Sequence, residues 1–196
     1  MYFLLISCIL TGFSPLQKEP DIPMSLGPTN FKIVRGFLTG ELLNFLGMYA
    51  FNQATLPNSI PTKETRGYID EQVPNTPAWN DDLAMRNLLF FLWPDAQANF
   101  GLEIVPTYSY LRVYKNGDEL KKHTDRAACE YSISITLKRN KEDAIWPLFL
   151  ETDKVYETIL EEGDGLLYKG IENTHWREKF EGEQLAQVFL HYVRRE

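Results

Sequence analysis

The chain is poor in histidine and cysteine and has no run rich in lysine or arginine, and each shortage excludes a class of function. Only three histidines and two cysteines occur among 196 residues. Cys8 and Cys129 stand far apart without a C-x-x-C pattern, which argues against a disulfide framework and against a thiolate zinc site. The net charge is −7 with no basic cluster, so we expect no sequence-independent binding of nucleic acid. The cysteine usage suits a reducing compartment, and we expect a cytoplasmic protein.

Several catalytic motifs and long apolar runs are also missing. The sequence contains no Gly-rich phosphate loop, no serine nucleophile elbow and no H-E-x-x-H motif. Its apolar opening, Met1–Phe13, is shorter than the ~20 residues that a membrane-spanning helix needs. It has the length of a signal-peptide core, but no cation precedes it and Ser14–Leu16 is a poor cleavage context. We expect residues 1–30 to form an apolar segment and loop that docks on the domain, with secretion as the alternative.

What the chain does have is enough apolar material for a core. Hydrophobic residues make up 44% of it, and 13% are aromatic, which fits one folded domain of this length rather than a disordered chain. We expect a single domain over residues 31–196, in which residues 31–107 form a helical and loop support and residues 108–196 a β-rich core.

Helical patterns occupy the support. Phe31–Arg35 alternates like a strand, and Thr39 can cap a following helix. We expect that helix to bury four apolar side chains, Leu42, Phe45, Leu46 and Tyr49. A second helix should begin after the capping run Asn80–Asp82 and end at Pro94. Its apolar stripe comprises Leu83, Ala84, Leu88, Phe91 and Leu92.

Short β-rich runs separated by turn residues fill the rest of the chain. They are Tyr108–Tyr114, Glu119–His123, Cys129–Lys138, Trp146–Glu151, Val155–Leu160, Gly165–Lys169, Thr174–Glu178 and Leu185–Val193. Eight such runs after a helical block predict a mainly β fold with some α, a two-sheet jelly roll with the N-terminal helices packed on one sheet. In the third run, Ser132, Ser134 and Thr136 share one face, which either lines a wet cavity or is exposed to solvent.

Two of the three histidines have a spacing that favours a metal site. His123 and Asp125 lie two residues apart in an extended segment, so their side chains can point to the same side. His175, in the seventh run, can supply a third ligand. Two imidazoles and one carboxylate on one face of an octahedron leave three positions open, which is typical of non-haem Fe(II) oxygenases. His191, in an apolar final strand, is interpreted as a core histidine rather than a fourth ligand.

The order of these residues resembles a known family. The sequence Tyr114…Gly117…His123-Thr124-Asp125, followed by Gly163-Asp164 and His175, is similar to the prolyl-4-hydroxylase-like branch of the 2-oxoglutarate/Fe(II)-dependent dioxygenases. The resemblance covers residues 108–196 well and extends to Phe31–Thr39. It implies a double-stranded β-helix that uses Fe(II), O2 and 2-oxoglutarate, with ascorbate as a possible supporting reductant. Such an enzyme hydroxylates a C–H bond and releases succinate and CO2.

The resemblance leaves open which cation binds the far carboxylate of 2-oxoglutarate. Family members carry Lys or Arg nine or ten residues after the last histidine, where this chain has Gln184 and Leu185. The candidates that replace it are, in order, Arg177, Arg112 and Lys138. Arg177 shares the face of His175, Arg112 alternates with Tyr114, the tyrosine that the family places against the co-substrate, and Lys138 has the spacing of the lysine in asparaginyl-hydroxylase relatives.

The substrate carries no readable signature. Arg126 and Tyr110 are the candidate substrate contacts, and the substrate is expected to be a peptide, a protein or a small molecule, not a nucleic acid. Two alternatives remain open: a cupin-like metal-binding barrel that takes no 2-oxoglutarate, and a barrel kept as a binding module. The sequence says nothing about the oligomeric state.

Overall fold

The computed structural model describes residues 26–27, 29–55, 67–74, 76–140 and 145–195. More of them lie in β-strands than in the three α-helices and one 3-10 helix. In chain order these elements are β1 (Phe31–Val34), α1 (Gly40–Thr55), β2 (Ala78–Asn80), α2 (Leu83–Phe91), α3 (Trp93–Phe100), β3 (Ile104–Lys115), β4 (Leu120–His123), η1 (Ala127–Cys129), β5 (Tyr131–Arg139), β6 (Leu148–Glu151), β7 (Val155–Thr158), β8 (Gly165–Tyr168), β9 (Thr174–Arg177) and β10 (Gln184–Arg194). The chain is mainly β, as the sequence predicts.

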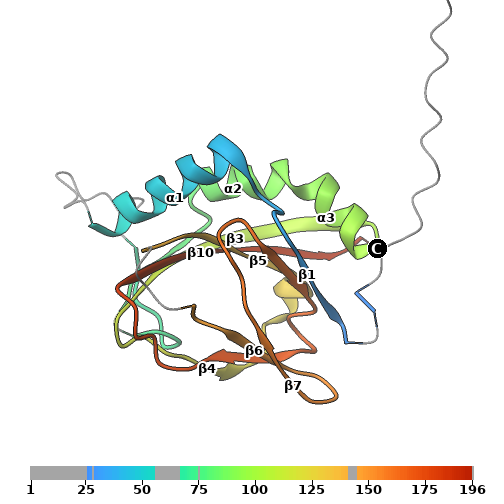
Figure 1. Ribbon diagram of the computed structural model, residues 1–196. Helices are drawn as coiled ribbons and strands as arrows, with labels where there is room; N and C mark the ends of the chain where they lie inside the picture. The colour runs from blue at the N-terminus through green and yellow to red at the C-terminus, as the bar shows by residue number, and fades with distance from the viewer. Residues whose placement is uncertain (1–25, 28, 56–66, 75, 141–144, 196) are drawn as a thin grey trace, which may run out of the picture.

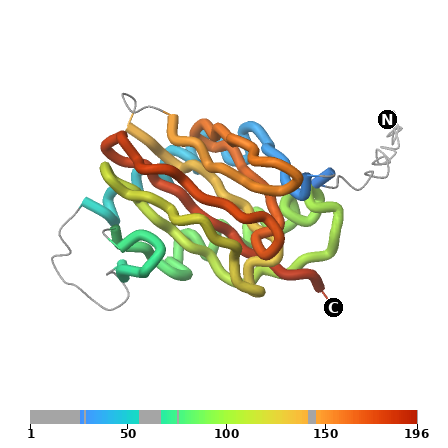
Figure 2. The backbone as a smooth tube through the Cα atoms, turned by 90° about the horizontal axis from the view of Figure 1, so that it is seen from below, coloured from blue at the N-terminus to red at the C-terminus, as the bar shows by residue number. Residues whose placement is uncertain are grey.

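The strands form two antiparallel sheets that face each other. One has six strands in the order β1-β8-β5-β10-β3-β2, and the other has four in the order β4-β9-β6-β7. Figure 1 shows the smaller sheet below the larger one, and Figure 2 shows β10 running beside β3 for most of its length. Each of the eight predicted runs after residue 107 corresponds to one of the strands β3 to β10. The short strand β2 was not predicted.

The three helices cover the outer face of the six-stranded sheet (Figure 1). Leu46 and Ala50 of α1 belong to the same buried cluster as Ile133 and Ile135 of β5. The predicted buried face of α1 is wrong in part: Phe45 is 62% exposed and Leu42 is 38% exposed. Gly47 is buried instead. A Cβ on residue 47 would lie only 2.9 Å from the carbonyl oxygen of Leu137. Only glycine lets α1 approach the sheet this closely.

The second helical segment contains two helices where the sequence analysis expected one. Asp82 caps α2 as predicted, because its side chain accepts hydrogen bonds from the backbone N–H groups of Ala84 and Met85. The predicted stripe is wrong at Leu83 and Phe91, which are 74% and 65% exposed, whereas Met85 is fully buried. Pro94 comes shortly after the end of α2 and lies in the first turn of α3, where its missing N–H costs no hydrogen bond.

The Gly163-Asp164 turn fastens the start of the domain to the sheet. The Asp164 carboxylate accepts hydrogen bonds from the backbone of Gly36 (3.0 Å) and Glu161 (2.9 Å) and pairs with Arg35. Burial raises the pKa of Asp164, but these hydrogen bonds and the Arg35 charge outweigh burial and hold it below its usual value. Gly163 has φ +85°, and a Cβ on it would overlap the Leu38 carbonyl. The turn therefore has a structural role, because it holds the segment that follows β1.

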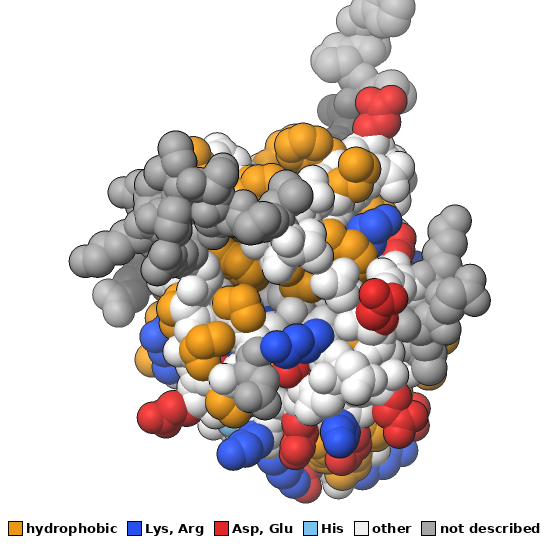
Figure 3. Space-filling model, turned by 90° about the vertical axis from the view of Figure 1, so that its left-hand side faces the viewer, with side chains coloured by type: hydrophobic (Ala, Val, Ile, Leu, Met, Phe, Trp, Pro, Cys, Tyr) orange, Lys and Arg blue, Asp and Glu red, His pale blue; other side chains and the backbone are white. Residues whose placement is uncertain are grey.

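Among the described residues, no helix has the length and apolar character that crossing a bilayer requires. The predicted docking segment, residues 1–30, falls almost wholly outside the described residues, and its role stays a prediction. On the face shown in Figure 3, the described acidic and basic side chains are interspersed rather than gathered by sign.

Candidate metal centre and its cavity

His123, Asp125 and His175 come together on the four-stranded sheet. His123 ends β4 and lies directly opposite His175 in the antiparallel pair β4–β9. Directly opposite residues of such a pair project from the same face, so the two imidazoles meet, with ring centroids 4.3 Å apart. Asp125 follows two residues after His123, in the segment that leads into η1. Strand pairing therefore brings the two histidines together, and the segment after β4 adds Asp125.

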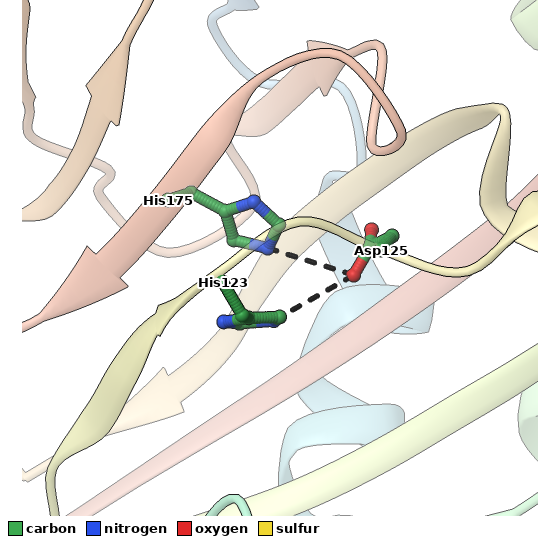
Figure 4. A group of neighbouring side chains, drawn as sticks. All are labelled: His123, Asp125 and His175. Atoms are coloured by element: carbon green, nitrogen blue, oxygen red, sulfur yellow. Dashed lines mark ion pairs between the residues drawn. The ribbon is translucent and has the colours of Figure 1, made fainter.

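The ligand atoms of the three side chains converge on one point (Figure 4). Asp125 Oδ1 lies 3.6 Å from His123 Nε2 and 3.7 Å from His175 Nε2. Ligand atoms of all three lie within 4.8 Å of one another. Each ring is oriented through its other nitrogen: Nδ1 of His123 lies 2.7 Å from the Lys121 carbonyl oxygen, and Nδ1 of His175 lies 2.9 Å from that of Asn173. Backbone contacts of this kind leave both Nε2 atoms free to bind a metal.

The charges of the three groups suit a cation. Burial raises the pKa of Asp125, but the hydrogen bond with His123 and the nearby histidines outweigh burial and lower it, so the carboxylate stays ionised. Burial lowers the pKa of His175, which favours the neutral ring that binds a metal. For His123, burial acts in the same direction, but the hydrogen bond to Asp125 and the contact with Lys121 raise the pKa overall.

Gly170 keeps Asp125 in place. The backbone N–H of Asp125 donates to the Gly170 carbonyl oxygen at 2.8 Å. A Cβ on Gly170 would overlap Asp125 Oδ2 and would lie 2.5 Å from the carbonyl oxygen of Cys129. The turn after β8 can therefore approach the carboxylate only because residue 170 has no side chain.

The three ligands line a cavity of about 380 Å³ between the sheets. Its walls include four of the other residues predicted for the site, Tyr110, Arg112, Tyr114 and Arg126. Asp70, Cys129 and His191 also line it, and none of them was predicted to do so. Ser132, Ser134 and Thr136 are all buried, so this face of β5 is interior and the solvent-exposed alternative is wrong.

Arg112 lines the cavity, but it is already engaged. Its guanidinium pairs with the Asp70 carboxylate and donates to the carbonyl oxygens of Val73 (3.3 Å) and Thr76 (3.2 Å). The hydroxyl of Tyr110 donates to the same Asp70 carboxylate. Arg112 thus holds residues 67–74, which we call the strap, across the cavity. Because its charge is balanced by Asp70, Arg112 is a weaker candidate for the co-substrate anchor than the sequence suggested.

Arg177 is buried without a carboxylate partner among the described residues. It is 2% exposed, its guanidinium carbon lies 4.6 Å from the centroid of the Trp146 ring, and it donates to the Trp146 carbonyl oxygen. Its Nε has no hydrogen-bond partner in the described part of the chain. Burial lowers the pKa of Arg177 to about 10, so the group stays charged at neutral pH. Arg177 is not part of the cavity wall. Its charge acts on Tyr114 and Tyr168, and both of these tyrosines line the cavity.

Lys138 is not in the cavity, and the structure corrects this candidate. The register between β5 and β10 shifts after Thr136, so that Ala186 pairs with Lys138 while Gln187 pairs with Thr136. Such a bulge breaks the alternation of faces that would otherwise place Lys138 on the same side as Ser134 and Thr136. The Lys138 amine therefore lies on the helix side of the sheet, 5.9 Å from the centroid of the Phe51 ring in α1.

Arg126 and Tyr108 form one wall of the cavity. The Arg126 guanidinium stacks on the Tyr108 ring, 4.7 Å from its centroid, and its Nε donates to the Tyr108 hydroxyl at 3.2 Å. Tyr108 also stacks on His191, which is 5% exposed and lies with Nδ1 2.9 Å from Ser132 Oγ. His191 is thus a buried histidine with a hydrogen-bond partner, and it also faces the cavity.

Comparison with solved structures shows the fold. No family model and no curated protein sequence matches the chain. A prolyl-4-hydroxylase of Pseudomonas putida is 19% identical, with 87% of this chain and 96% of that chain covered and a TM-score of 0.62. HygX of Streptomyces hygroscopicus, solved with nickel, 2-oxoglutarate and hygromycin B, is 10% identical, with coverage of 86% and 84% and a TM-score of 0.64. A Trichoplax adhaerens prolyl hydroxylase, solved with a hypoxia-inducible-factor peptide, is 13% identical, with 85% of each chain covered and a TM-score of 0.61. The chain therefore has the jelly-roll fold of the 2-oxoglutarate/Fe(II) oxygenases.

Proposed function

We propose that this protein is an Fe(II)- and 2-oxoglutarate-dependent dioxygenase that hydroxylates a C–H bond of a peptide, protein or small molecule. The observation that carries the proposal is the convergence of His123, Asp125 and His175 on one point inside a cavity. The overall reaction balances: O2 and 2-oxoglutarate give succinate and CO2, and one oxygen atom enters the C–H bond of the substrate.

The donor set fits ferrous iron. Two imidazole nitrogens and one carboxylate oxygen are the ligands that non-haem Fe(II) oxygenases use. Both histidines present Nε2 because their Nδ1 atoms contact backbone carbonyls. The site lies in a cavity, so the positions that the protein leaves open on an ion are accessible to a chelating co-substrate and oxygen.

Arg177 supports the assignment of 2-oxoglutarate. A buried guanidinium without a neighbouring carboxylate is costly, and a ligand carboxylate would balance its charge. The unpartnered Nε offers a donor for that carboxylate. Tyr114 lines the cavity and interacts with the Arg177 charge, so it is the neighbouring candidate contact for the co-substrate. Arg177 Nη2 donates to Gln187 Oε1 at 3.5 Å, and this contact holds the guanidinium on the β10 side.

Bound iron would supply the activation of oxygen and the oxidation of the co-substrate. The protein's own residues have simpler tasks. Asp125 and the two histidines fix the ligand geometry, and Arg177 with Tyr114 orients the co-substrate. Arg126 and Tyr110, at the cavity wall, are the proposed substrate contacts. One structural neighbour was solved with a peptide and another with the small molecule hygromycin B, so both substrate classes are kept.

One observation favours a second function, a metal-binding barrel that takes no 2-oxoglutarate. Arg112, the cation in the cavity wall beside Tyr114, is already neutralised by Asp70. If Arg177 does not accept a ligand, Arg112 is the other buried cation among the described residues, and its charge is already paired with Asp70.

Turnover measurements test the proposal. Reduced protein supplied with Fe(II), 2-oxoglutarate and O2 should form succinate even without its substrate, because uncoupled turnover needs only the co-substrate. His123→Ala and His175→Ala should abolish both iron binding and succinate formation. Lys121→Ala is the matched control, since Lys121 lies on the same strand as His123 with an exposed side chain. Full turnover in both histidine variants would exclude this metal site, and iron binding without any succinate would favour the second function.

A further inference from the structure

A second group of metal-ligating side chains lies on the other side of Asp125. Ligand atoms of Asp125, Cys129 and His191 all lie within 4.8 Å of one another. Cys129 and His191 are nearly fully buried, and all three residues line the cavity. The proposed hydroxylation uses neither Cys129 nor His191.

The two oxygens of the shared carboxylate have different neighbours. Asp125 Oδ1 faces the Nε2 atoms of His123 and His175. Asp125 Oδ2 points the other way, toward Ser132 Oγ at 3.4 Å. Ser132 in turn lies 2.9 Å from His191 Nδ1 and 3.2 Å from the Cys129 carbonyl oxygen. One carboxylate can therefore serve two cations, one on each oxygen.

His191 is oriented as a metal ligand would be. In the tautomer that donates from Nδ1 to Ser132, the lone pair is on Nε2. Among the described residues Nε2 has no hydrogen-bond partner. The ring is fixed by Tyr108, which stacks on it with centroids 4.6 Å apart. The same tyrosine lies with its hydroxyl 3.0 Å from Cys129 Sγ, so it positions both ligands.

We propose that Asp125, Cys129 and His191 form a second cation site, selective for a thiophilic divalent ion such as Zn²⁺. Thiolate, imidazole and carboxylate are all zinc ligands, and in a tetrahedral zinc site they lie about 3.3–3.8 Å apart. The group needs only a modest contraction to reach that spacing. Binding transfers the Cys129 thiol proton to solvent and leaves the fourth position for water or the Tyr108 hydroxyl. Sequence spacing could not show this site because Asp125 precedes η1, Cys129 ends η1 and His191 lies far along the chain in β10.

Anaerobic titration with Co²⁺ tests the site, because a cobalt–thiolate bond gives a near-ultraviolet charge-transfer band that oxygen and nitrogen ligands do not. The wild-type protein should bind two equivalents of Co²⁺ and show the band. Cys129→Ser should bind one equivalent without the band, and the His123→Ala/His175→Ala double variant should bind one equivalent with it. His191→Asn should weaken the band-forming site by at least tenfold.

The other cysteine provides the matched control. Cys8→Ser should titrate like the wild type, and circular dichroism should show that every variant is folded. Co²⁺ binding to the wild type without a thiolate band would overturn the proposal, as would a band that survives Cys129→Ser and is lost in Cys8→Ser. The inference does not rest on the proposed function, since the double variant removes the triad and keeps this site.

Discussion

Arg177 lies two residues after His175 on β9, and both side chains are buried on the same face of the strand. The predicted metal ligand and the buried guanidinium are therefore neighbours inside the barrel. The guanidinium contacts the Trp146 ring and its carbonyl oxygen but no carboxylate among the described residues. We assign this uncompensated charge to co-substrate binding.

Replacing Arg177 should separate binding from stability. Arg177→Met should weaken 2-oxoglutarate binding roughly 10- to 100-fold, since a charge-assisted pair contributes about 1.5–3 kcal/mol. The thermal midpoint should be at least as high as that of the wild type, because methionine removes a buried, unbalanced charge. Calorimetry of co-substrate binding and thermal unfolding measure the two effects. Lys138→Met is the matched control and should leave binding unchanged, because Lys138 lies against α1. Equal co-substrate affinity in the wild type and Arg177→Met would remove Arg177 as the anchor.

Replacing Arg112 should lower the stability of the protein, unlike the replacement of Arg177. Arg112→Met leaves the Asp70 carboxylate without its cation, and breaking a buried pair from one side typically costs about 3–5 kcal/mol. The variant should therefore unfold at lower denaturant concentration and be cleaved faster by protease within the strap, residues 67–74. The double variant Arg112→Met/Asp70→Asn should recover part of the loss. A fully stable Arg112→Met protein would contradict the role given to this pair.

Gly170→Ala should damage the metal site without touching a ligand. The new Cβ would overlap Asp125 Oδ2, so the carboxylate must move. Displaced or unsupported ligands typically cost 10- to 100-fold in metal affinity, and we expect a loss of about that size. Competition against a coloured chelator measures it. Circular dichroism separates a shifted ligand from an unfolded chain, and unchanged affinity in a folded variant would show that Asp125 is not held by this contact.

Asp164 should give a pH-dependent contribution to stability. Its pKa is lowered in the folded protein, so the contribution is present above the unfolded value of about 3.9 and is lost as pH falls through the folded pKa. Asp164→Asn should cost about 1–3 kcal/mol at pH 7, because the amide presents N–H groups to backbone donors. Urea unfolding at pH 7 and near pH 3 should show a smaller difference at the lower pH. A stability difference between the wild type and Asp164→Asn that grows as the pH falls would contradict a lowered pKa of Asp164.

The strands and the candidate metal-binding residues could be predicted because they depend on local patterns. Short β-rich runs between turn residues identify the strands β3 to β10, and the H-x-D spacing places His123 and Asp125 on one side of the chain. The faces of α1 and α2 were harder. Phe45 and Phe91 are apolar at helical spacing, yet the sheet selects the face with Gly47 and Met85, where the helices can approach closely.

Tertiary contacts decided the rest of the site. The Asp70 carboxylate that neutralises Arg112 comes from the strap, 42 residues earlier in the chain, and no local pattern marks it. Lys138 has the spacing of a lysine in asparaginyl-hydroxylase relatives, but a one-residue bulge in β5 directs its side chain to the helix side of the sheet. Cys129 and His191 looked like ordinary core residues, and only the fold places them beside Asp125.

The most direct test of the central claim is the visible charge-transfer band that forms when 2-oxoglutarate chelates Fe(II) in the absence of oxygen. Wild-type protein loaded with one equivalent of Fe(II) should develop this band and saturate with 2-oxoglutarate. His175→Ala should show none, and Arg177→Met should need roughly 10- to 100-fold more co-substrate. An iron-loaded wild-type protein that shows no band at saturating 2-oxoglutarate would contradict the account.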